Sequence, residues 1–218
     1  MRFRDLTVDQ FVSLLASAEP VPGGGSAAAV AGSLGGALVA MVASLSVGRP
    51  KFAEHEQLLT EARAAGLLLA DRFLTLADED AAAFAGFGVA MKMPRETEDE
   101  KAARAKALQA AARAATEAPY RTVEACLQLA LEAESMAGRS NKNASSDLEV
   151  AGLMAVAAAR SAAANVFINV PAMGDDATAQ EMLVRTEEMV GDVERLALRI
   201  REIVRGGETR PPAEVGTA

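Results

Sequence analysis

The residues best suited to proton transfer form an acidic trio, Asp78-Glu79-Asp80, in a segment with helical spacing. Most acidic clusters on helices are solvated faces. Asp80, however, precedes Phe84 by four positions, and residues four apart share one face of a helix. A carboxylate beside an apolar wall has a raised pKa and can serve as a general acid or base. Asp80 is therefore the first candidate catalytic residue, against the alternative of an ordinary surface acid.

A second polar cluster lies in the segment GRSNKNASSD. One interpretation is helix capping, because Ser146 and Glu149 have the spacing of a capping box and an acidic residue suits the first turn. The other is a loop that presents amide, ammonium and carboxylate groups to a substrate, with the acid as a second catalytic candidate. The residues concerned are Asn141, Lys142, Asn143 and Asp147.

Three consecutive glycines lie between Pro22 and an uncharged run that ends at Gly48. Glycine lets the backbone approach a ligand closely, and the free N–H groups of a first helical turn suit an anion or a polarised ligand. No Gly-Lys-Ser/Thr follows, so this is not a Walker loop. A flexible linker into a core helix is the alternative. The candidate binding residues are Gly23, Gly24, Gly25 and Ser26.

Two amides and several cations complete the candidates. Asn165 and Asn169 lie one turn apart in an apolar segment, where a buried amide needs either an interhelical hydrogen bond or a ligand. Lys92 and Arg95 flank Met93-Pro94 at a helix break, which is either a surface turn or an anion clamp. Lys51 lies at another break, in GRPKF.

Composition narrows the classes of function. The chain has 218 residues and a formal net charge of −8, which argues against nucleic acid and anionic membrane surfaces as partners. With one cysteine, Cys126, and one histidine, His55, a His/Cys metal site is implausible and no intrachain disulfide can form. A reducing, cytoplasmic location fits the cysteine usage. We expect His55 to be a solvated surface residue.

The elements that must position these residues are helices, because alanine is abundant and no strand pattern occurs. We expect a single-domain, all-α bundle of six or seven long helices over residues 1–206, with a disordered tail over 207–218. Pro119 is expected to begin a new helix. Small residues form a stripe along segment 26–47, so another helix can pack closely. That segment could span a membrane by length, but a buried helix is favoured. The expected helices are 7–19, 26–47, 52–90, 98–118, 119–137, 146–170 and 178–205.

In this order the motifs resemble one family over most of the chain. PVPGGGSAAA, GRPKF, the DxxxF element, KMPRETEDEKAAR, NKNASSDLEVAGLMA and NVFIN are similar to the cyclodeaminase/cyclohydrolase family of folate enzymes. That family includes the cyclodeaminase half of formimidoyltransferase-cyclodeaminase and the bacterial methenyltetrahydrofolate cyclohydrolase. Arg139-Ser140 and Phe167 depart from the family pattern. The resemblance implies a helical homodimer that acts on a one-carbon-substituted tetrahydrofolate without metal or organic cofactor.

Two reactions follow from the resemblance. The main expectation is a cyclodeaminase, which closes 5-formimidoyl-tetrahydrofolate to 5,10-methenyl-tetrahydrofolate with loss of ammonia and would need a separate formimidoyltransferase. The alternative is a cyclohydrolase, which adds water to the methenyl carbon and gives 10-formyl-tetrahydrofolate. A non-catalytic helical oligomerisation protein is the alternative from another class. A polyglutamylated folate tail would need a local cationic clamp, for which Lys142 is the first choice among Lys51, Lys92, Arg95 and Lys142.

Overall fold

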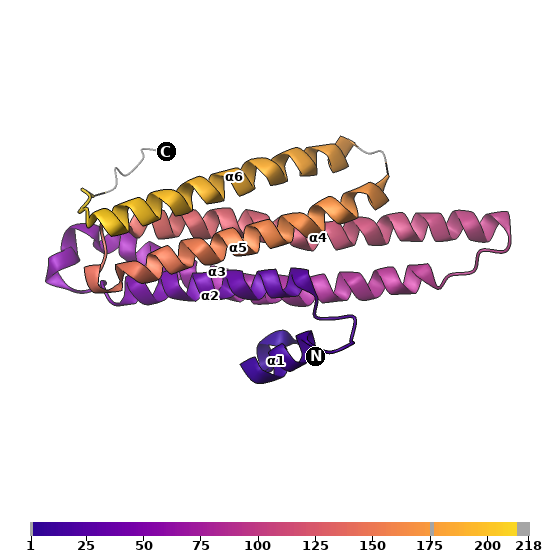
Figure 1. The fold of residues 1–218 in the computed structure, drawn as a ribbon, viewed down its shortest axis with the longest axis horizontal. Coiled ribbons are helices and arrows are strands. Elements are labelled where there is room, and N and C mark those ends of the chain that lie inside the picture. Colours follow the sequence, from indigo (N-terminus) through magenta and orange to yellow (C-terminus); the bar gives the residue numbers. More distant parts are fainter. Residues whose placement is uncertain (1, 175–176, 213–218) are drawn as a thin grey trace.

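The computed structural model describes residues 2–174 and 177–212, and in those ranges it contains six α-helices and no strand. The predicted all-α fold is confirmed (Figure 1). Four short 3-10 helices, η1 to η4, cover Phe3–Asp5, Pro50–His55, Lys142–Ala144 and Val170–Met173. The α-helices are α1 (Val8–Leu15), α2 (Gly24–Ser44), α3 (Glu56–Met91), α4 (Glu98–Met136), α5 (Ser145–Asn169) and α6 (Ala177–Gly206).

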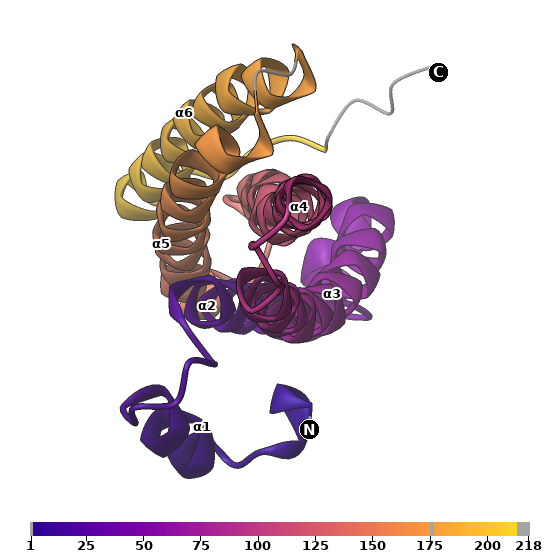
Figure 2. The ribbon, with the colours of Figure 1, turned by 90° about the vertical axis from the view of Figure 1, so that its right-hand side faces the viewer.

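Helices α2 to α6 run lengthwise and form the bundle, whereas α1 lies outside it (Figures 1 and 2). The antiparallel pair α3 and α4 extends past the other helices at one end, where its connecting turn holds Lys92 and Arg95 (Figure 1). The main core lies between α2, α3, α4 and α5 and is built largely of alanine and leucine. These long helices set the position of every polar side chain considered below.

Helices α2 and α3 touch backbone to backbone where two glycines meet. A Cβ atom built on Gly36 would lie 2.9 Å from the backbone nitrogen of Ala70, and one on Gly66 would lie 2.8 Å from the carbonyl oxygen of Gly36. Both distances are shorter than van der Waals contact, so only glycine fits at this crossing. The stripe predicted the close approach of another helix, and at Gly36 that helix is α3 of the same chain.

Pro119 does not begin a new helix, as was expected, but lies inside the 39-residue helix α4. A proline in a helix interior has no N–H, so the carbonyl four residues earlier loses its partner. That carbonyl belongs to Ala115, and the Asn169 side chain of α5 donates a hydrogen bond to it, with Nδ2 2.9 Å from the oxygen. The helix continues because a neighbouring helix supplies the missing donor.

Helix ends follow the sequence prediction only in part. A capping box of Thr7 and Gln10 begins α1 close to the expected start of the first helix. The box predicted for Ser146 and Glu149 is absent, because α5 begins one residue earlier and no side chain caps it. The side chain of Asn141 instead accepts a hydrogen bond from the Asn143 backbone N–H at the start of η3.

His55 was expected at the surface, but only 7 % of it is exposed, at the junction of η2 and α3. The 3-10 turn that Pro50 begins directs its ring inward, which the helical pattern of the surrounding sequence did not indicate. Its position at the far end of α2 from Asp80 excludes a triad between them within one chain.

Two apolar stretches, Gly24–Ser44 and Lys142–Met173, are long and apolar enough to cross a bilayer. In the bundle, 61 % of the most apolar window of the first and 44 % of that of the second are buried. The core helix of a soluble protein meets the same criteria, so they are weak evidence for a span. The burial of α2 agrees with the core-helix interpretation.

The end of α6 at Gly206 coincides with the expected domain boundary, but the residues that follow are held in place as far as Pro212. The Arg210 backbone N–H donates to the Gly138 carbonyl at 3.0 Å, and its guanidinium lies 2.9 Å from Glu134. Arg139 donates to the Pro211 carbonyl at 2.6 Å. The expected disordered tail is therefore bonded over 207–212, and residues 213–218 lie outside the described part.

Candidate functional site

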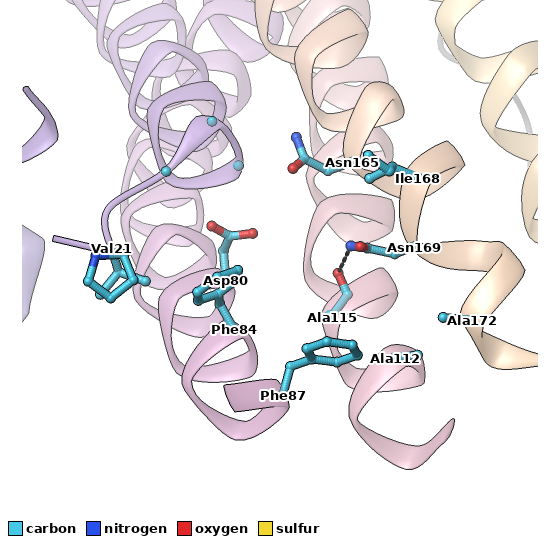
Figure 3. A pocket seen from close by; sticks show the side chains of 14 residues that line it. Val21, Asp80, Phe84, Phe87, Ala112, Ala115, Asn165, Ile168, Asn169 and Ala172 are labelled. Carbon is cyan, nitrogen blue, oxygen red and sulfur yellow. Dashed lines mark hydrogen bonds between the residues drawn. The ribbon is translucent and has the colours of Figure 1, made fainter. Parts of the chain in front are cut away.

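A cavity of about 400 Å³ opens where the N-terminus of α2 meets α3, α4 and α5. The glycine loop forms one side and α5 the other, with Asp80 of α3 pointing between them (Figure 3). Asp80 is the one ionisable side chain among the described residues that line the cavity. Four candidate groups predicted from distant parts of the sequence therefore meet here: the Gly23–Gly25 loop, Asp80, Asn165 and Asn169.

The glycine loop makes room for the Asp80 carboxylate. A Cβ atom built on Gly25 would lie 2.2 Å from Oδ1 of Asp80, so any larger residue would displace the acid. The Ser26 hydroxyl donates to Oδ2 of Asp80 at 2.9 Å and lies 3.2 Å from the Ala77 carbonyl oxygen. Ser26 is fully buried and is not among the residues that line the cavity, so its hydroxyl supports the carboxylate from the protein interior. A role of Ser26 in binding substrate stays a prediction.

Burial raises the pKa of Asp80 above its ordinary value, and the hydrogen bonds from Ser26 oppose that rise. Among the described residues no cation forms an ion pair with this carboxylate. An unpaired acid at the edge of an apolar cavity accepts and returns a proton more readily near neutral pH than a solvated aspartate does. It also attracts a positively charged group that enters the cavity.

The two predicted asparagines lie on the α5 side of the cavity, and each has one end committed to a backbone carbonyl. Asn169 donates to Ala115, as described above, and Asn165 donates to the Ser161 carbonyl of its own helix at 2.8 Å. Among the described residues, no donor is bonded to Oδ1 of either asparagine. Each side chain can thus offer an acceptor to a ligand N–H while its amide nitrogen holds it in place.

The remaining walls are apolar. Phe84 and Phe87 of α3, Ile168 of α5 and Val21 before the glycine loop line the cavity, with Ala112 and Ala115 at its α4 side (Figure 3). A flat ring system with polar edges fits such walls. Phe87, Val21 and Ile168 were not predicted as site residues. Phe87 could have been found from its spacing after Asp80 and Phe84. Val21 and Ile168 lie within the motifs PVPGGGSAAA and NVFIN, but an aliphatic side chain does not by itself indicate a site.

The second predicted cluster lies elsewhere. Asn141 is held by a hydrogen bond from its backbone N–H to the Ser46 hydroxyl, 2.9 Å away and just beyond the C-terminus of α2. Helix α2 has 21 residues and is therefore about 30 Å long, with the cavity at its other end. Within one chain the cavity and this end of the bundle are separate. The residues at that end are Lys51, Asn141, Lys142, Asn143 and Asp147.

The cations are divided between the two ends of the bundle. Lys142, the first choice for the clamp, lies 3.4 Å from the Gly207 carbonyl oxygen, and Lys51 lies over the ring of Phe52. Lys92 and Arg95 are exposed in the α3–α4 turn. This turn follows the C-terminal part of α3, which also contributes Asp80 and Phe87 to the cavity. Of the four predicted cations, Lys92 and Arg95 are therefore the two at the cavity end of the bundle within one chain.

Among the described residues, no three His, Cys, Asp or Glu side chains are grouped so that they could hold a metal ion. Cys126 is fully buried, and its surroundings raise the pKa of the thiol well above the ordinary value. Neither observation suggests a metal centre in these parts of the chain.

The sequence and the fold of this chain match known proteins over most of its own length. The family model described as "Formiminotransferase-cyclodeaminase" matches residues 7–188. The chain belongs to the formiminotransferase-cyclodeaminase family. The predicted resemblance to folate cyclodeaminases and cyclohydrolases is thereby confirmed. A methenyltetrahydrofolate cyclohydrolase from Methylorubrum extorquens is 38 % identical over 199 residues, which cover 91 % of this chain and 96 % of that protein.

Other relatives are named as cyclodeaminases rather than cyclohydrolases. The formimidoyltransferase-cyclodeaminase of Gallus gallus is 32 % identical over 180 residues, or 83 % of this chain, which spans only 32 % of that longer protein. A formiminotetrahydrofolate cyclodeaminase from Thermotoga maritima has the same fold, with a TM-score of 0.84 and 27 % identity over 93 % of this chain and 98 % of its own. Both kinds of relative are enzymes, which confirms the prediction of an enzyme over that of a non-catalytic oligomerisation protein.

Proposed function

We propose that this protein is a methenyltetrahydrofolate cyclohydrolase, the alternative rather than the main expectation from the sequence. The observation that carries the proposal is the 38 % identity to the Methylorubrum extorquens cyclohydrolase, which this chain matches almost from end to end. The cyclodeaminase relatives from vertebrates share 32 or 33 % and are about three times as long. The cavity supports the proposal, because a cationic methenyl group fits beside the unpaired Asp80 carboxylate.

In this reaction Asp80 moves one proton twice. The carboxylate takes a proton from water as the oxygen bonds to the methenyl carbon, which neutralises the cation shared by N5 and N10. The protonated Asp80 then gives its proton to N5 as the bond from carbon to N5 breaks, and the hydroxyl proton leaves to solvent. The products are 10-formyl-tetrahydrofolate and one proton. Only proton transfer and charge stabilisation are needed, so we propose that the enzyme works without metal or organic cofactor.

A spectrophotometric assay tests this function. Methenyl-tetrahydrofolate absorbs in the near ultraviolet, so the enzyme should accelerate the loss of that absorption well above the buffer rate. Prior treatment with a chelator should leave the rate unchanged. Absence of acceleration by a folded, folate-binding preparation would rule out the cyclohydrolase assignment.

The cyclodeaminase remains the second candidate, because a solved cyclodeaminase shares the whole fold. In that reaction N10 attacks the formimidoyl carbon and passes its N–H proton, by way of solvent, to the formimidoyl nitrogen. A protonated Asp80 would donate the second proton as the bond from carbon to that nitrogen breaks and ammonia departs. The raised pKa of Asp80 suits an acid as well as a base. The same assay separates the two functions: absorption would appear from 5-formimidoyl-tetrahydrofolate, and a formimidoyltransferase would be needed as a partner to supply it.

We further propose that the enzyme is a homodimer in the cytoplasm, paired through the outward face of α2 and α5. Helix α2 carries no charged residue, although charged residues make up 24 % of the chain. Copies with a net charge of −8 repel one another, so they associate most easily through a face without charge. A shallow groove lies in this face between Ala31 and Ala157, and Gly24 and Asn165 connect it with the cavity.

A two-fold axis through the middle of this face exchanges the two ends of α2. The Asn141 loop, which is bonded beyond the C-terminus of α2, would then lie beside the Gly24 end of the second copy. We propose that Asn141, Lys142, Asn143 and Asp147 act there, on the substrate held in the other chain's cavity. Loss of activity on dilution below the dimerisation constant would support this arrangement, and full activity in a proven monomer would contradict it.

A further inference from the structure

The first helix is the one α-helix of the described chain that lies outside the bundle, with only Phe11 and Leu14 packed against the edge of the main core (Figure 2). The chain on its N-terminal side is fixed to α3, where the Phe3 backbone N–H donates to Asp78 at 2.7 Å and Arg4 pairs with Asp71 at 2.6 Å. On its C-terminal side, residues 16–23 lead to the start of α2. Between these two attachments α1 lies on the outward side of α2, apart from the bundle (Figure 2).

One face of α1 is apolar and has no cover. Val8 is 83 % exposed, Val12 56 % and Leu15 38 %, and at 3.6 residues per turn these three share a face. The opposite face is polar, and the inner one holds Phe11, whose ring lies edge-on to Phe3 at 5.6 Å. A helix of eight residues is not stable alone in water, so such a face is expected to have a partner.

The outward face of α2 has a matching stripe. Leu34 is 55 % exposed, Met41 40 % and Leu45 37 %, and their spacing again places them on one side of the helix. No charge interrupts this stripe. The two exposed stripes do not cover each other within one chain, because α1 stands away from α2 (Figure 2).

We propose that α1 is an arm that packs on a second copy of the chain. Its Val8, Val12 and Leu15 face would contact the exposed α2 stripe of that copy, defined above. Two-fold symmetry then covers both arms and both stripes at once. This inference rests on the homodimer proposed above and goes beyond it by assigning α1 to the interface.

A lipid surface is the other apolar partner that an amphipathic helix could have, and charge disfavours it. Helix α1 contains Asp9 and no lysine or arginine, whereas surface-binding helices are rich in basic residues on the polar face. The net charge of −8 adds repulsion from an anionic bilayer. A second copy, which offers an uncharged stripe, is the occupant that the charges favour.

The arm also bears on the cavity. Pro20 and Val21 belong to the segment that joins α1 to α2, and both line the cavity. Packing of α1 on the second copy would therefore also fix the position of Pro20 and Val21 in the cavity wall. Substrate binding and association are thereby linked through one short segment.

The first test changes the charge of the arm. Val12→Asp places a charge on the exposed apolar face, and Ser13→Asp places the same charge one residue on, on the polar face. By light scattering, wild type and Ser13→Asp should be dimers, and Val12→Asp should dissociate at a concentration at least ten times higher. Equal dissociation of the two variants would overturn the inference.

The second test is a cross-link, which also serves if Val12→Asp fails to fold. Val12→Cys is co-expressed with Leu34→Cys or with Leu45→Cys on differently tagged chains and oxidised mildly. The natural Cys126 is buried and unreactive, so it gives no background. A disulfide between unlike chains in either pair, absent from each single variant, supports the arm. No such disulfide in either pair overturns it.

Neither test uses a folate, so a negative result for the arm can be distinguished from a failure of the proposed reaction. A wild-type monomer would remove both the proposed dimer and the arm, whereas a dimer without the disulfide would remove the arm alone. Activity of that dimer in the absorption assay would leave the proposed function intact.

Discussion

At the scale of the residue, Asp80 combines reactivity with a cost in stability. Its carboxylate is partly buried, has no cationic partner among the described residues and is held by the Ser26 hydroxyl. A carboxyl group whose pKa is raised by folding stabilises the folded state while it is protonated. That stabilisation is complete below the pKa of the unfolded chain and is lost as the pH rises through the folded pKa. At neutral pH the ionised acid therefore lowers the free energy of unfolding.

The variant Asp80→Asn tests both properties. We expect turnover to fall by about two orders of magnitude or more, the effect of removing a general acid–base group. The melting temperature should exceed that of wild type at pH 7, and the difference should shrink as the pH is lowered toward about 4. Kinetics and thermal melts at both pH values measure this. Near-normal turnover would exclude Asp80 from proton transfer, and a lower melting temperature at pH 7 would contradict the assigned burial cost.

The hydroxyl of Ser26 is predicted to set the pH at which Asp80 ionises. The bond that this hydroxyl donates to Asp80, and a second bond from the Ser26 backbone, favour the charged form and so lower the pKa that burial has raised. Ser26→Ala should therefore move the acid limb of the kcat/KM profile to higher pH, while Ser26→Thr, which keeps a hydroxyl, should move it less. An acid limb at the wild-type pH in Ser26→Ala would show that another group controls it.

At the scale of the element, helix type and most boundaries follow from local sequence, but the course of α4 does not. Proline predicts a helix boundary because it leaves a carbonyl without a partner. The donor that removes this penalty is Asn169, which belongs to a helix later in the chain. The pattern correctly offered an interhelical bond or a ligand as roles for this asparagine. Which of them it takes depends on packing between helices, which a single sequence does not reveal.

Replacing Asn169 should destabilise the protein because the Ala115 carbonyl would lose its donor. We expect Asn169→Ala to lower the free energy of unfolding by about 1–2 kcal/mol. Asn165→Ala is the matched control, since its bond lies within its own helix, and should cost less. Denaturant unfolding of both variants measures the difference, and equal losses would refute the role assigned to Asn169.

The crossing of α2 and α3 should tolerate no side chain at its closest point. A methyl group at Gly36 meets the backbone of Ala70, which cannot move without shifting the helix. Gly36→Ala should therefore cost about 1–3 kcal/mol of stability. In contrast, a Cβ at Gly86 of α3 meets nothing within 4 Å, so Gly86→Ala should stabilise by about 0.5–1 kcal/mol. Opposite signs in chemical denaturation are expected, and a loss at both positions would refute the assignment of the clash.

At the scale of the whole molecule, the predicted site residues divide between the two ends of α2. Asp80, the glycine loop and both asparagines meet at one end, and the Asn141 loop lies at the other. Residue types and helical spacing were sufficient to select both groups. They could not show the distance between them, because that distance depends on where α2 and α5 lie in the bundle.

The folate tail gives a test of which end supplies its clamp. Lys92 and Arg95 are the predicted cations toward the cavity side of one chain, so Lys92→Ala with Arg95→Ala should raise KM for a polyglutamylated substrate. The rise should be a few-fold, since exposed charge pairs are weak, and larger than for the monoglutamate, with kcat unchanged. Lys51→Ala, at the other end of α2, is the control.

A selective effect of Lys142→Ala instead would place the tail against the Asn141 loop of a second copy. That result would contradict the clamp at the α3–α4 turn.

The bond between Asn169 and the carbonyl freed by Pro119 also bears on how this family changes during evolution. In a relative without proline at the position of Pro119, the backbone N–H there would bond the carbonyl four residues earlier in the same helix. The amide at the position of Asn169 would then no longer be needed as the donor to that carbonyl. A relative that keeps the proline but loses the amide carries an unpaired carbonyl between two helices. The two positions are far apart in the chain, yet they are expected to covary. Where both have changed, this wall of the cavity would be free to acquire a new specificity.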